Sequence, residues 1–329
     1  MENNRIIYCL LLLTLFLGAC EKPEELWKLP PSGQETLASV NMGATYDNAV
    51  FFTLHTGAIE TKNIYSWHLG FASGATEHDI ILNGGNEVQI HQTNDTSFSI
   101  TPIVKPKTEW LWDNPNGKID STAFSGWYDT LTNTTANKVY LIDLGNKSIV
   151  KFKKLKILSV NPTDFVIRYA NLDGSQEITM RIPKNTRTNY TYCNLDNNTI
   201  IPFEPENQTW DILFTRYRYV YYDMEPITPY YVNGVLINTK HVWIAETKQF
   251  SFEEIDLAKA NQLLLTQKAD EIGFDWKFFD LNGSGKYVVD SKKIFIIKNK
   301  DGYLYKLRFI DFYDESGAKG VPKFAYQRL

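Results

Sequence analysis

Alternating apolar and polar residues recur along most of this chain, and this pattern of a half-buried β-strand constrains its fold most strongly. The clearest runs are residues 139–144, 165–169, 177–182 and 293–297. Asp173-Gly174 and Asp301-Gly302 lie between such runs and predict hairpin turns. Tyr, Phe, Val, Ile and Thr, which favour strands, are abundant in the composition. We therefore expect an all-β fold made mainly of antiparallel sheets.

One segment is typical of a helix instead. Ser251 and Glu254 have the spacing of a capping box, in which each side chain satisfies a free backbone N–H at a helix start. Apolar residues follow at helical intervals up to about Lys268. The sequence thus predicts one short amphipathic helix near residues 252–268.

The amino-terminal residues are typical of an export signal. Residues 6–17 form an apolar run that is too short to span a bilayer comfortably, and it ends at Leu17-Gly18-Ala19-Cys20. This resembles a bacterial lipobox, which implies cleavage before Cys20 and attachment of lipid to it. We expect residues 1–19 to be a lipoprotein signal peptide and residues 20–35 to contain the lipid-attachment cysteine and a Pro-rich tether. The alternatives are an ordinary secretory signal with a chance cysteine and, less favoured, a transmembrane anchor.

The body of the chain repeats a short pattern. Phe51-Phe-Thr-Leu54 precedes Trp67 and Asn83-Gly84, whereas Tyr192-Cys-Asn-Leu195 precedes Trp210 and Asn233-Gly234. Each tryptophan opens a W-x-[LI]-x-F strand pattern, and each Asn-Gly pair is expected to be a turn. The pattern indicates two related β halves, residues 36–135 and 136–329, with Trp67 and Trp210 in equivalent buried positions; chance agreement of short apolar motifs is the alternative.

Charge and motifs exclude several classes of function. The 34 Lys and Arg residues against 38 Asp and Glu residues give a net charge of −4, which argues against a nucleic-acid partner. The chain has no GxSxG, HExxH, Walker A or Rossmann pattern. Cys193 has no histidine near it in sequence and is expected to be a buried, inert thiol. We therefore expect a protein that is not an enzyme.

From residue 138 onward the chain carries five further motifs in a fixed order. They are Tyr140-Leu-Ile-Asp-Leu-Gly145, Phe165-Val-Ile-Arg-Tyr-Ala170, Trp210-Asp-Ile-Leu-Phe-Thr-Arg-Tyr217, Ile272-Gly-Phe-Asp-Trp-Lys277 and Tyr305-Lys-Leu-Arg-Phe-Ile-Asp-Phe-Tyr313. These motifs resemble the HmuY family of surface lipoproteins, whose best-studied members bind haem. The resemblance is strongest over residues 138–329. It implies a β fold and a location on the outer membrane, exposed at the cell surface. It also implies haem or a related tetrapyrrole as ligand and an outer-membrane transporter as partner.

The same resemblance directs attention to axial ligands, because family members hold haem iron between two side chains. Met224 and His241 are the candidates here, with no metal expected beyond haem iron, and the aromatic run supplies Tyr217, Arg218, Tyr221 and Tyr222 as candidate haem contacts. Each ligand candidate also has a structural interpretation: Met224 as a gap-filling thioether, and His241 as an edge-strand histidine. A non-haem surface binding or adhesion module on the same β scaffold is the alternative function.

Overall fold

The computed structural model describes residues 32–329, and Gly33–Leu329 form one compact unit. The signal peptide and Cys20 lie outside the described residues. The first eleven strands are β1 (Thr36–Ser39), β2 (Asn48–Phe52), β3 (Ile59–Asn63), β4 (Leu69–Ala72), β5 (Ile80–Leu82), β6 (Gln89–Gln92), β7 (Tyr128–Asp129), β8 (Thr134–Thr135), β9 (Val139–Asp143), β10 (Phe152–Val160) and β11 (Asp164–Asn171). The next eleven are β12 (Ile178–Pro183), β13 (Tyr190–Asn194), β14 (Thr199–Ile201), β15 (Ile212–Tyr221), β16 (Thr228–Ile237), β17 (Trp243–Thr247), β18 (Lys277–Phe279), β19 (Tyr287–Val289), β20 (Ile294–Lys298), β21 (Leu304–Tyr313) and β22 (Lys319–Arg328). The short helical elements are η1 (Ile64–Ser66), η2 (Gly84–Asn86), η3 (Lys107–Glu109), η4 (Ile119–Ser121) and α2 (Leu257–Ala260).

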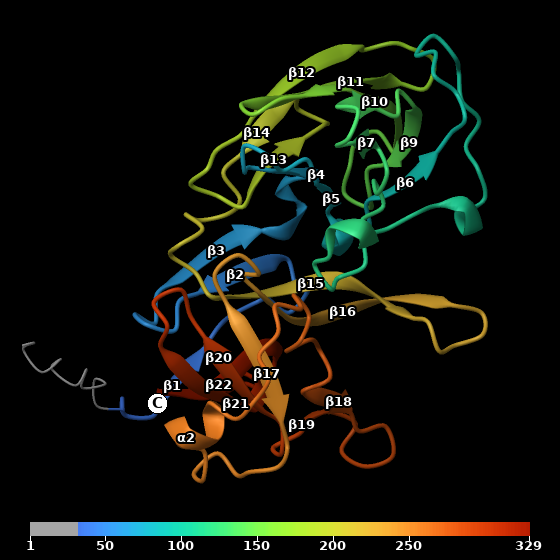
Figure 1. The fold of residues 1–329 in the computed structure, drawn as a ribbon. Coiled ribbons are helices and arrows are strands. Elements are labelled where there is room, and N and C mark those ends of the chain that lie inside the picture. Colours follow the sequence, from blue (N-terminus) through green and yellow to red (C-terminus); the bar gives the residue numbers. More distant parts are fainter. Residues whose placement is uncertain (1–31) are drawn as a thin grey trace, which may run out of the picture. The chain divides into compact units, whose positions relative to one another are not determined.

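The expected all-β, antiparallel fold is confirmed, and its sheets come in equivalent pairs (Figure 1). The five-stranded sheets have the orders β1-β22-β21-β20-β17 and β12-β11-β10-β9-β6. The four-stranded sheets have the orders β16-β15-β2-β3 and β14-β13-β4-β5. Each sheet maps onto its counterpart when the strand numbers are shifted by eleven. The described chain is thus two copies of an eleven-strand unit.

The two copies exchange their first strands. β2 of the first copy pairs with β15 of the second, and β13 of the second copy pairs with β4 of the first. We call the two resulting sandwiches the terminal lobe (sheets β1-β22-β21-β20-β17 and β16-β15-β2-β3) and the central lobe (the other two large sheets). The expected boundary between residues 135 and 136 does not separate sheets, because β6 before it pairs with β9 after it.

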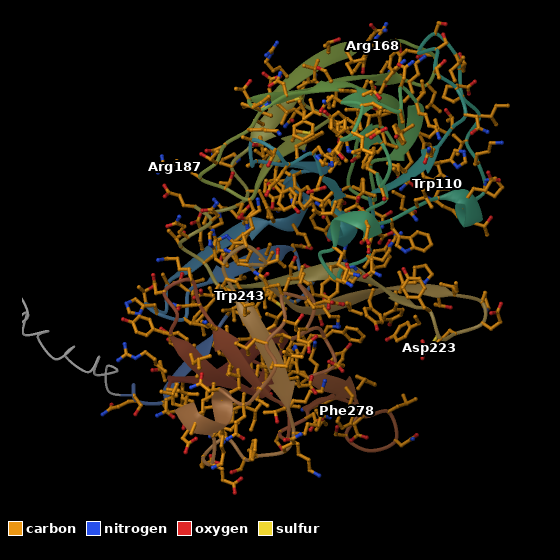
Figure 2. All side chains as sticks on the ribbon, viewed as in Figure 1. Trp110, Arg168, Arg187, Asp223, Trp243 and Phe278 are labelled. Atoms are coloured by element: carbon orange, nitrogen blue, oxygen red, sulfur yellow. The ribbon has the colours of Figure 1, made fainter. Side chains whose placement is uncertain are left out.

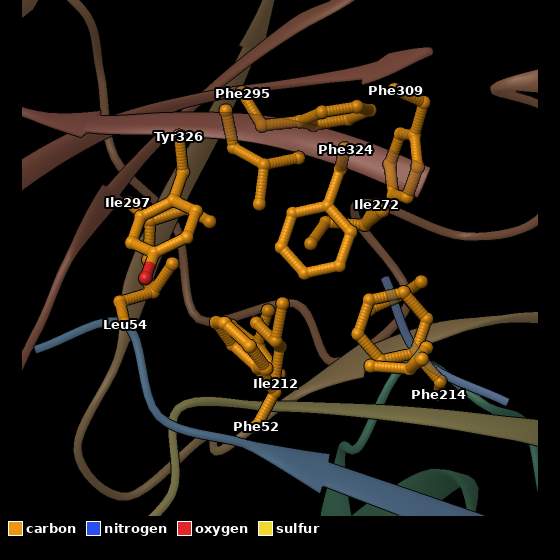
Figure 3. Packing of buried hydrophobic residues seen from close by; sticks show 14 of the residues in the cluster. Phe52, Leu54, Ile212, Phe214, Ile272, Phe295, Ile297, Phe309, Phe324 and Tyr326 are labelled. Carbon is orange, nitrogen blue, oxygen red and sulfur yellow. The ribbon is translucent and has the colours of Figure 1, made fainter. Parts of the chain in front are cut away.

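Each lobe has its own apolar core. In the terminal lobe, Phe52 and Phe214 from one sheet pack with Phe309 and Phe324 from the other (Figure 3). In the central lobe, strands β4, β5 and β13 cover β9, β10 and β11 in the same way. Burial of alternate side chains from both sheets is the arrangement that the period-two pattern predicts.

A third cluster lies where the middle sheets of the two lobes meet, and it contains both repeated tryptophans. Trp67 and Trp210 are buried there with Phe51, Tyr192 and Phe203. Both tryptophans are therefore buried in one cluster, as the repeat predicts.

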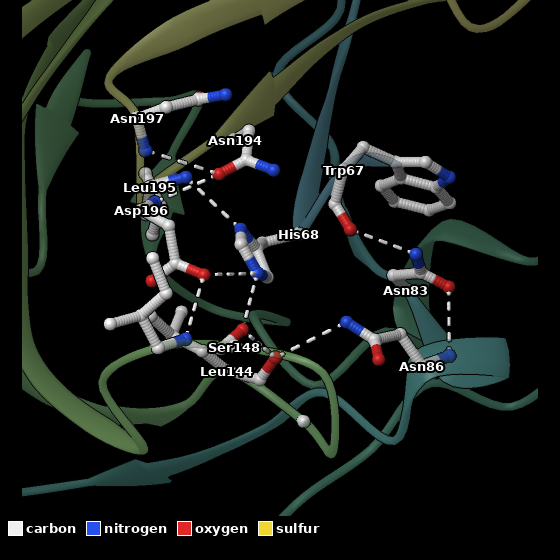
Figure 4. Close-up of polar contacts among 12 residues, drawn as sticks. Trp67, His68, Asn83, Asn86, Leu144, Ser148, Asn194, Leu195, Asp196 and Asn197 are labelled. Atoms are coloured by element: carbon white, nitrogen blue, oxygen red, sulfur yellow. Dashed lines mark hydrogen bonds and ion pairs between the residues drawn. The ribbon is translucent and has the colours of Figure 1, made fainter. Parts of the chain in front are cut away.

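The same asparagine contact follows each tryptophan. The Asn83 side-chain amide donates to the Trp67 carbonyl at 2.8 Å (Figure 4), and the Asn238 amide donates to the Trp210 carbonyl at 3.0 Å. Asn238, not Asn233, is therefore the structural equivalent of Asn83. The expected Asn233-Gly234 turn is instead inside β16, where Gly234 pairs with Thr215. The backbone at Gly273 passes so close to β16 that a Cβ at Gly234 would lie 2.3 Å from the Gly273 carbonyl oxygen. Position 234 therefore requires glycine.

The exchanged strands are also fastened by an equivalent pair of side chains. His68 Nδ1 accepts a hydrogen bond from the Leu195 backbone N–H at 3.0 Å (Figure 4). Asp211, at the matching position of the second copy, accepts one from the Leu54 N–H at 2.7 Å. A histidine and an aspartate thus have the same structural role in the two copies.

The helix is shorter than the sequence predicts. Ser251 and Glu254 do form the reciprocal capping contacts, but these close a turn. The helix itself is only α2, capped by Asp256 through the Lys259 N–H. The chain then returns to the sheet, where Thr266 and Ile244 pair. Tertiary pairing overrides the local helical pattern. Within residues 32–329, no helix has the length and apolar character needed to cross a membrane.

Candidate functional site

The hairpin of β15 and β16 in the terminal lobe extends well beyond β2, which pairs only with residues 212–214 of β15. Its ten pairs run without a break from Ile212↔Ile237 to Tyr221↔Thr228, and Asp223 marks its tip (Figure 2). In the first copy the equivalent strands, β4 and β5, have only four and three residues. The hairpin extension is thus a property of the second copy alone.

Aromatic rings line the outer part of this hairpin. Tyr219 lies 5.1 Å from Tyr221 and 5.0 Å from Phe274, measured between ring centroids. Tyr221 is also 6.4 Å from Tyr230 across the strand pair. We call these four residues the hairpin aromatic cluster. The two contacts of Tyr219 are edge-to-face, which is a preferred geometry of aromatic pairs.

Large apolar and aromatic side chains at and near the tip are exposed. The exposed fraction is 60% for Tyr222, 47% for Met224, 53% for Ile227 and 59% for Tyr230. Large exposed apolar patches mark binding sites, which makes the tip a candidate.

The predicted haem-contact residues fall into two groups. Tyr221 and Tyr222 lie at the outer end of the hairpin with Met224. Tyr217 and Arg218 lie nearer its base, are buried, and line a cavity there. The four residues predicted from the sequence as one group of haem contacts therefore belong to two different places on the hairpin.

The two candidate axial ligands are not brought together. Met224 is in the loop at the hairpin tip, whereas His241 follows the other end of β16, where its N–H donates to the Asn238 carbonyl. The ten residues of β16 separate them by roughly 30 Å at the rise of an extended strand. We therefore do not assign His241 as a partner of Met224. Burial lowers the pKa of His241, helped by the neighbouring Lys240 charge.

The remaining histidine inside the fold is held by structural contacts. Nε2 of His68 lies 2.7 Å from the Ser148 hydroxyl, which donates to the Leu144 carbonyl (Figure 4). Since Nδ1 accepts from Leu195, the ring proton is assigned to Nε2. Burial lowers the pKa of His68 to about 4, so the ring is neutral at pH 7. Among residues 32–329 there is no group of three or more His, Cys, Asp or Glu side chains placed to hold a metal ion.

The cavity lies at the base of the hairpin and has a volume of about 220 Å³. It is partly open to solvent, because the exposed Lys118 and Ile119 are among its lining residues. Its walls come from η2 and β5 of the first copy, from residues 112–122, and from β15 and β16 of the second copy. Trp67 and Trp210 also line it. The cavity is therefore built around the meeting point of the two repeats.

Three buried carboxyl groups lie at this cavity. Glu204 accepts hydrogen bonds from the Asn189 and Tyr190 N–H groups and from the Trp210 indole, and burial raises its pKa to about 7. Asp113 accepts from the Leu82 and Ala123 N–H groups, and burial raises its pKa to about 6. Burial likewise raises the pKa of Asp79.

Sequence reasoning did not find these cavity residues. Asp113, Asn189 and Glu204 come from loops that no motif marks, and their neighbours are set by the strand exchange. Cys193, which does not line the cavity, is buried as the sequence predicts, and burial raises the pKa of its thiol to about 12.

Comparison with protein families identifies one match. The family described as HmuY protein matches residues 186–326, which run from just before β13 into β22 and include the whole hairpin. This confirms the resemblance over that segment, which is less than half of the chain. No curated protein matches the chain.

Solved structures give only weak similarity. Apo PinO from Porphyromonas gingivitis is 12% identical with a TM-score of 0.27, covering 90% of this chain and 97% of that chain. The apo HmuY analog of Tannerella forsythia is 14% identical with a TM-score of 0.25, covering 91% and 98%. TM-scores this low support no inference about this chain.

Proposed function

We propose, from the match of residues 186–326 to the HmuY family, that this chain is a non-enzymatic surface lipoprotein that captures haem or a related tetrapyrrole. Cys20 anchors it through lipid to the outer membrane, and an outer-membrane transporter receives the ligand. The observation that carries the proposal is the extended hairpin, which lies wholly within the matched segment and bears the exposed aromatic and thioether side chains.

The chemistry of the hairpin suits a flat, amphipathic ligand. Tyrosine rings stack on an aromatic macrocycle and keep their hydroxyls in water. The Met224 thioether is a ligand that haem iron accepts, and nearly half of the side chain is exposed. We place the tetrapyrrole on the tip surface formed by Tyr221, Tyr222 and Met224, with Met224 as one axial ligand.

A haem titration followed by absorbance tests the proposal. Wild-type protein should give a Soret shift that saturates at one equivalent. Met224→Leu should shift the Soret maximum and weaken binding, because leucine has nearly the same volume but no sulfur. Met180→Leu is the matched control: Met180 lies in β12 of the central lobe and its sulfur is 3.9 Å from the Tyr169 hydroxyl. It should retain the wild-type spectrum.

A featureless spectrum with wild-type protein would refute haem binding and favour the alternative of a non-haem binding or adhesion module. The anchor is tested separately. Cys20→Ala should move the protein from the membrane fraction to the soluble fraction, because a lipid chain provides the attachment. Full retention in membranes would refute the lipoprotein assignment.

A further inference from the structure

Several residues that line the cavity at the base of the hairpin carry buried polar atoms without a partner among the described residues. Nε and Nη1 of Arg218, the Trp67 indole nitrogen and Oδ1 of Asn189 make no hydrogen bond within the described chain. The three residues are 6%, 7% and 5% exposed, and all line this one cavity. Buried donors and acceptors are normally paired, since leaving one unpaired is costly.

Other charged groups that line the cavity are hydrogen-bonded. Arg216 uses Nε and Nη2 on the Gly85 carbonyl, at 2.9 and 2.6 Å. Glu204 and Asp113 are held by the backbone and side-chain donors described above. The Tyr217 hydroxyl is the other unpaired polar atom among the lining residues. The unpaired atoms therefore belong to Arg218, Trp67, Asn189 and Tyr217, whereas Arg216, Glu204 and Asp113 are paired.

Arg218 is also fixed in place. Its guanidinium carbon lies 5.2 Å from the ring centroid of Trp112 and 4.9 Å from that of Tyr231, and Nη2 donates to the Tyr231 hydroxyl. Burial lowers its pKa to about 10, so the group is still cationic at neutral pH. A positioned cation with unused donors is a receptor for an oxyanion.

The apolar part of the lining and the volume of the cavity restrict the class of ligand further. Ile81, Leu213 and Leu236 supply apolar surface. A cavity of about 150 Å³ accommodates benzene, whereas this one has about 220 Å³. The space fits one ring with a carboxylate and a small substituent, and it is below the roughly 300–1,000 Å³ of pockets for larger ligands.

We propose that this cavity binds a small organic carboxylate with an apolar body about one ring in size. Its carboxylate lies against Arg218 and the Trp67 indole N–H. A hydroxyl or amino substituent donates to Oδ1 of Asn189. This site is distinct from the hairpin tip and does not depend on tetrapyrrole binding.

Calorimetric titration of the purified protein with benzoate, 4-hydroxybenzoate and benzamide tests the proposal. Benzoate should bind at one site per chain and at least tenfold more tightly than benzamide, which has the same shape without the charge. 4-Hydroxybenzoate should bind at least as tightly as benzoate. Tryptophan fluorescence should change on binding, because Trp67, Trp112 and Trp210 line the cavity.

Two variants locate the site. Arg218→Gln should remove the preference for benzoate over benzamide, and Leu213→Phe should weaken both probes at least tenfold by filling the space. Arg168→Gln is the matched control, because Arg168 forms an exposed ion pair with Glu177 in the central lobe. It should bind both probes as wild type does.

Several outcomes would overturn the proposal. These are the absence of saturable benzoate binding, equal affinity for benzoate and benzamide, or benzoate binding that survives Leu213→Phe. The wild-type comparison of acid and amide stands even where Arg218→Gln does not fold. Loss of haem binding in a folded Arg218→Gln variant, together with no benzoate binding to wild type, would assign Arg218 to the tetrapyrrole instead.

Discussion

The equivalent side chains His68 and Asp211 should give the two copies opposite responses to pH. Both accept a hydrogen bond from the backbone of an exchanged strand. Burial lowers the pKa of His68 to about 4, and burial raises the pKa of Asp211 to about 6. In each case the fold favours the neutral form, but one group becomes charged by gaining a proton and the other by losing one.

The signs follow from proton uptake on unfolding. Below pH 6.5 the unfolded state protonates His68 while the folded state does not, so acidification favours unfolding. From pH 8 to pH 5 this linkage should lower the free energy of unfolding by about 2 kcal/mol. Above pH 3.8 the unfolded state loses the Asp211 proton before the folded state does, so raising the pH favours unfolding. From pH 5 to pH 8 this should cost about 1 kcal/mol.

Asparagine at either position keeps an acceptor for the backbone N–H but does not titrate. Urea unfolding at pH 5, 6, 7 and 8 should therefore show that the deficit of His68→Asn relative to wild type shrinks by about 2 kcal/mol as the pH falls. For Asp211→Asn, the free energy of unfolding relative to wild type should instead increase by about 1 kcal/mol as the pH rises. Titrating groups that do not interact with the substituted side chain cancel in each difference. A pH-independent difference for His68→Asn, or two differences that change in the same direction, would refute the reasoning.

Three further predictions concern the repeated architecture. Asn83→Ala and Asn238→Ala should each lower the free energy of unfolding in urea by about 2–3 kcal/mol, because each leaves two buried or partly buried carbonyls without a donor. A loss below about 0.5 kcal/mol at either site would contradict the shared role. Gly145→Ala should destabilise by at least about 2 kcal/mol more than Gly126→Ala. Both glycines have positive φ, but only a Cβ at Gly145 would lie 1.9 Å from the Asn86 carbonyl oxygen, so equal melting temperatures would argue against that close approach. Residues 186–329 expressed alone should lack a cooperative thermal transition in circular dichroism, because β13, β15 and β22 lose β4, β2 and β1, whereas residues 33–329 should unfold cooperatively.

The sequence predicted the strand content and the repeat because both depend on local patterns. Alternation gives the strands, and the W-x-[LI]-x-F element with a preceding apolar strand is present in each copy. The equivalence of Asn238 and Asn83 was missed because an Asn-Gly pair such as Asn233-Gly234 is a strong local turn signal. In the structure, Gly234 is needed instead because the backbone at Gly273 lies against it. The helix was overestimated for a similar reason, since the pairing of Thr266 with Ile244 ends it early.

The strand exchange itself leaves no local signal. Residues of β2 pair with β15 more than 150 positions later, and either strand would show the same alternation if it paired within its own copy. For that reason a boundary near residue 135 was reasonable from composition but does not match the sheets. The cavity was inaccessible to sequence reasoning for the same cause, because its polar residues meet only after the exchange.

The two copies have kept their framework and diverged where ligands would bind. Trp67 and Trp210, Asn83 and Asn238, and the His68 and Asp211 acceptors make matching contacts. The hairpins that follow the tryptophans do not match: seven strand residues in β4 and β5 become twenty in β15 and β16. The added length carries the hairpin aromatic cluster and Met224 outward, while the base of the same hairpin brings Arg218 to the cavity. One extension of a duplicated strand pair therefore accounts for both candidate sites, and it explains why neither has a counterpart on β4 and β5 in the first copy.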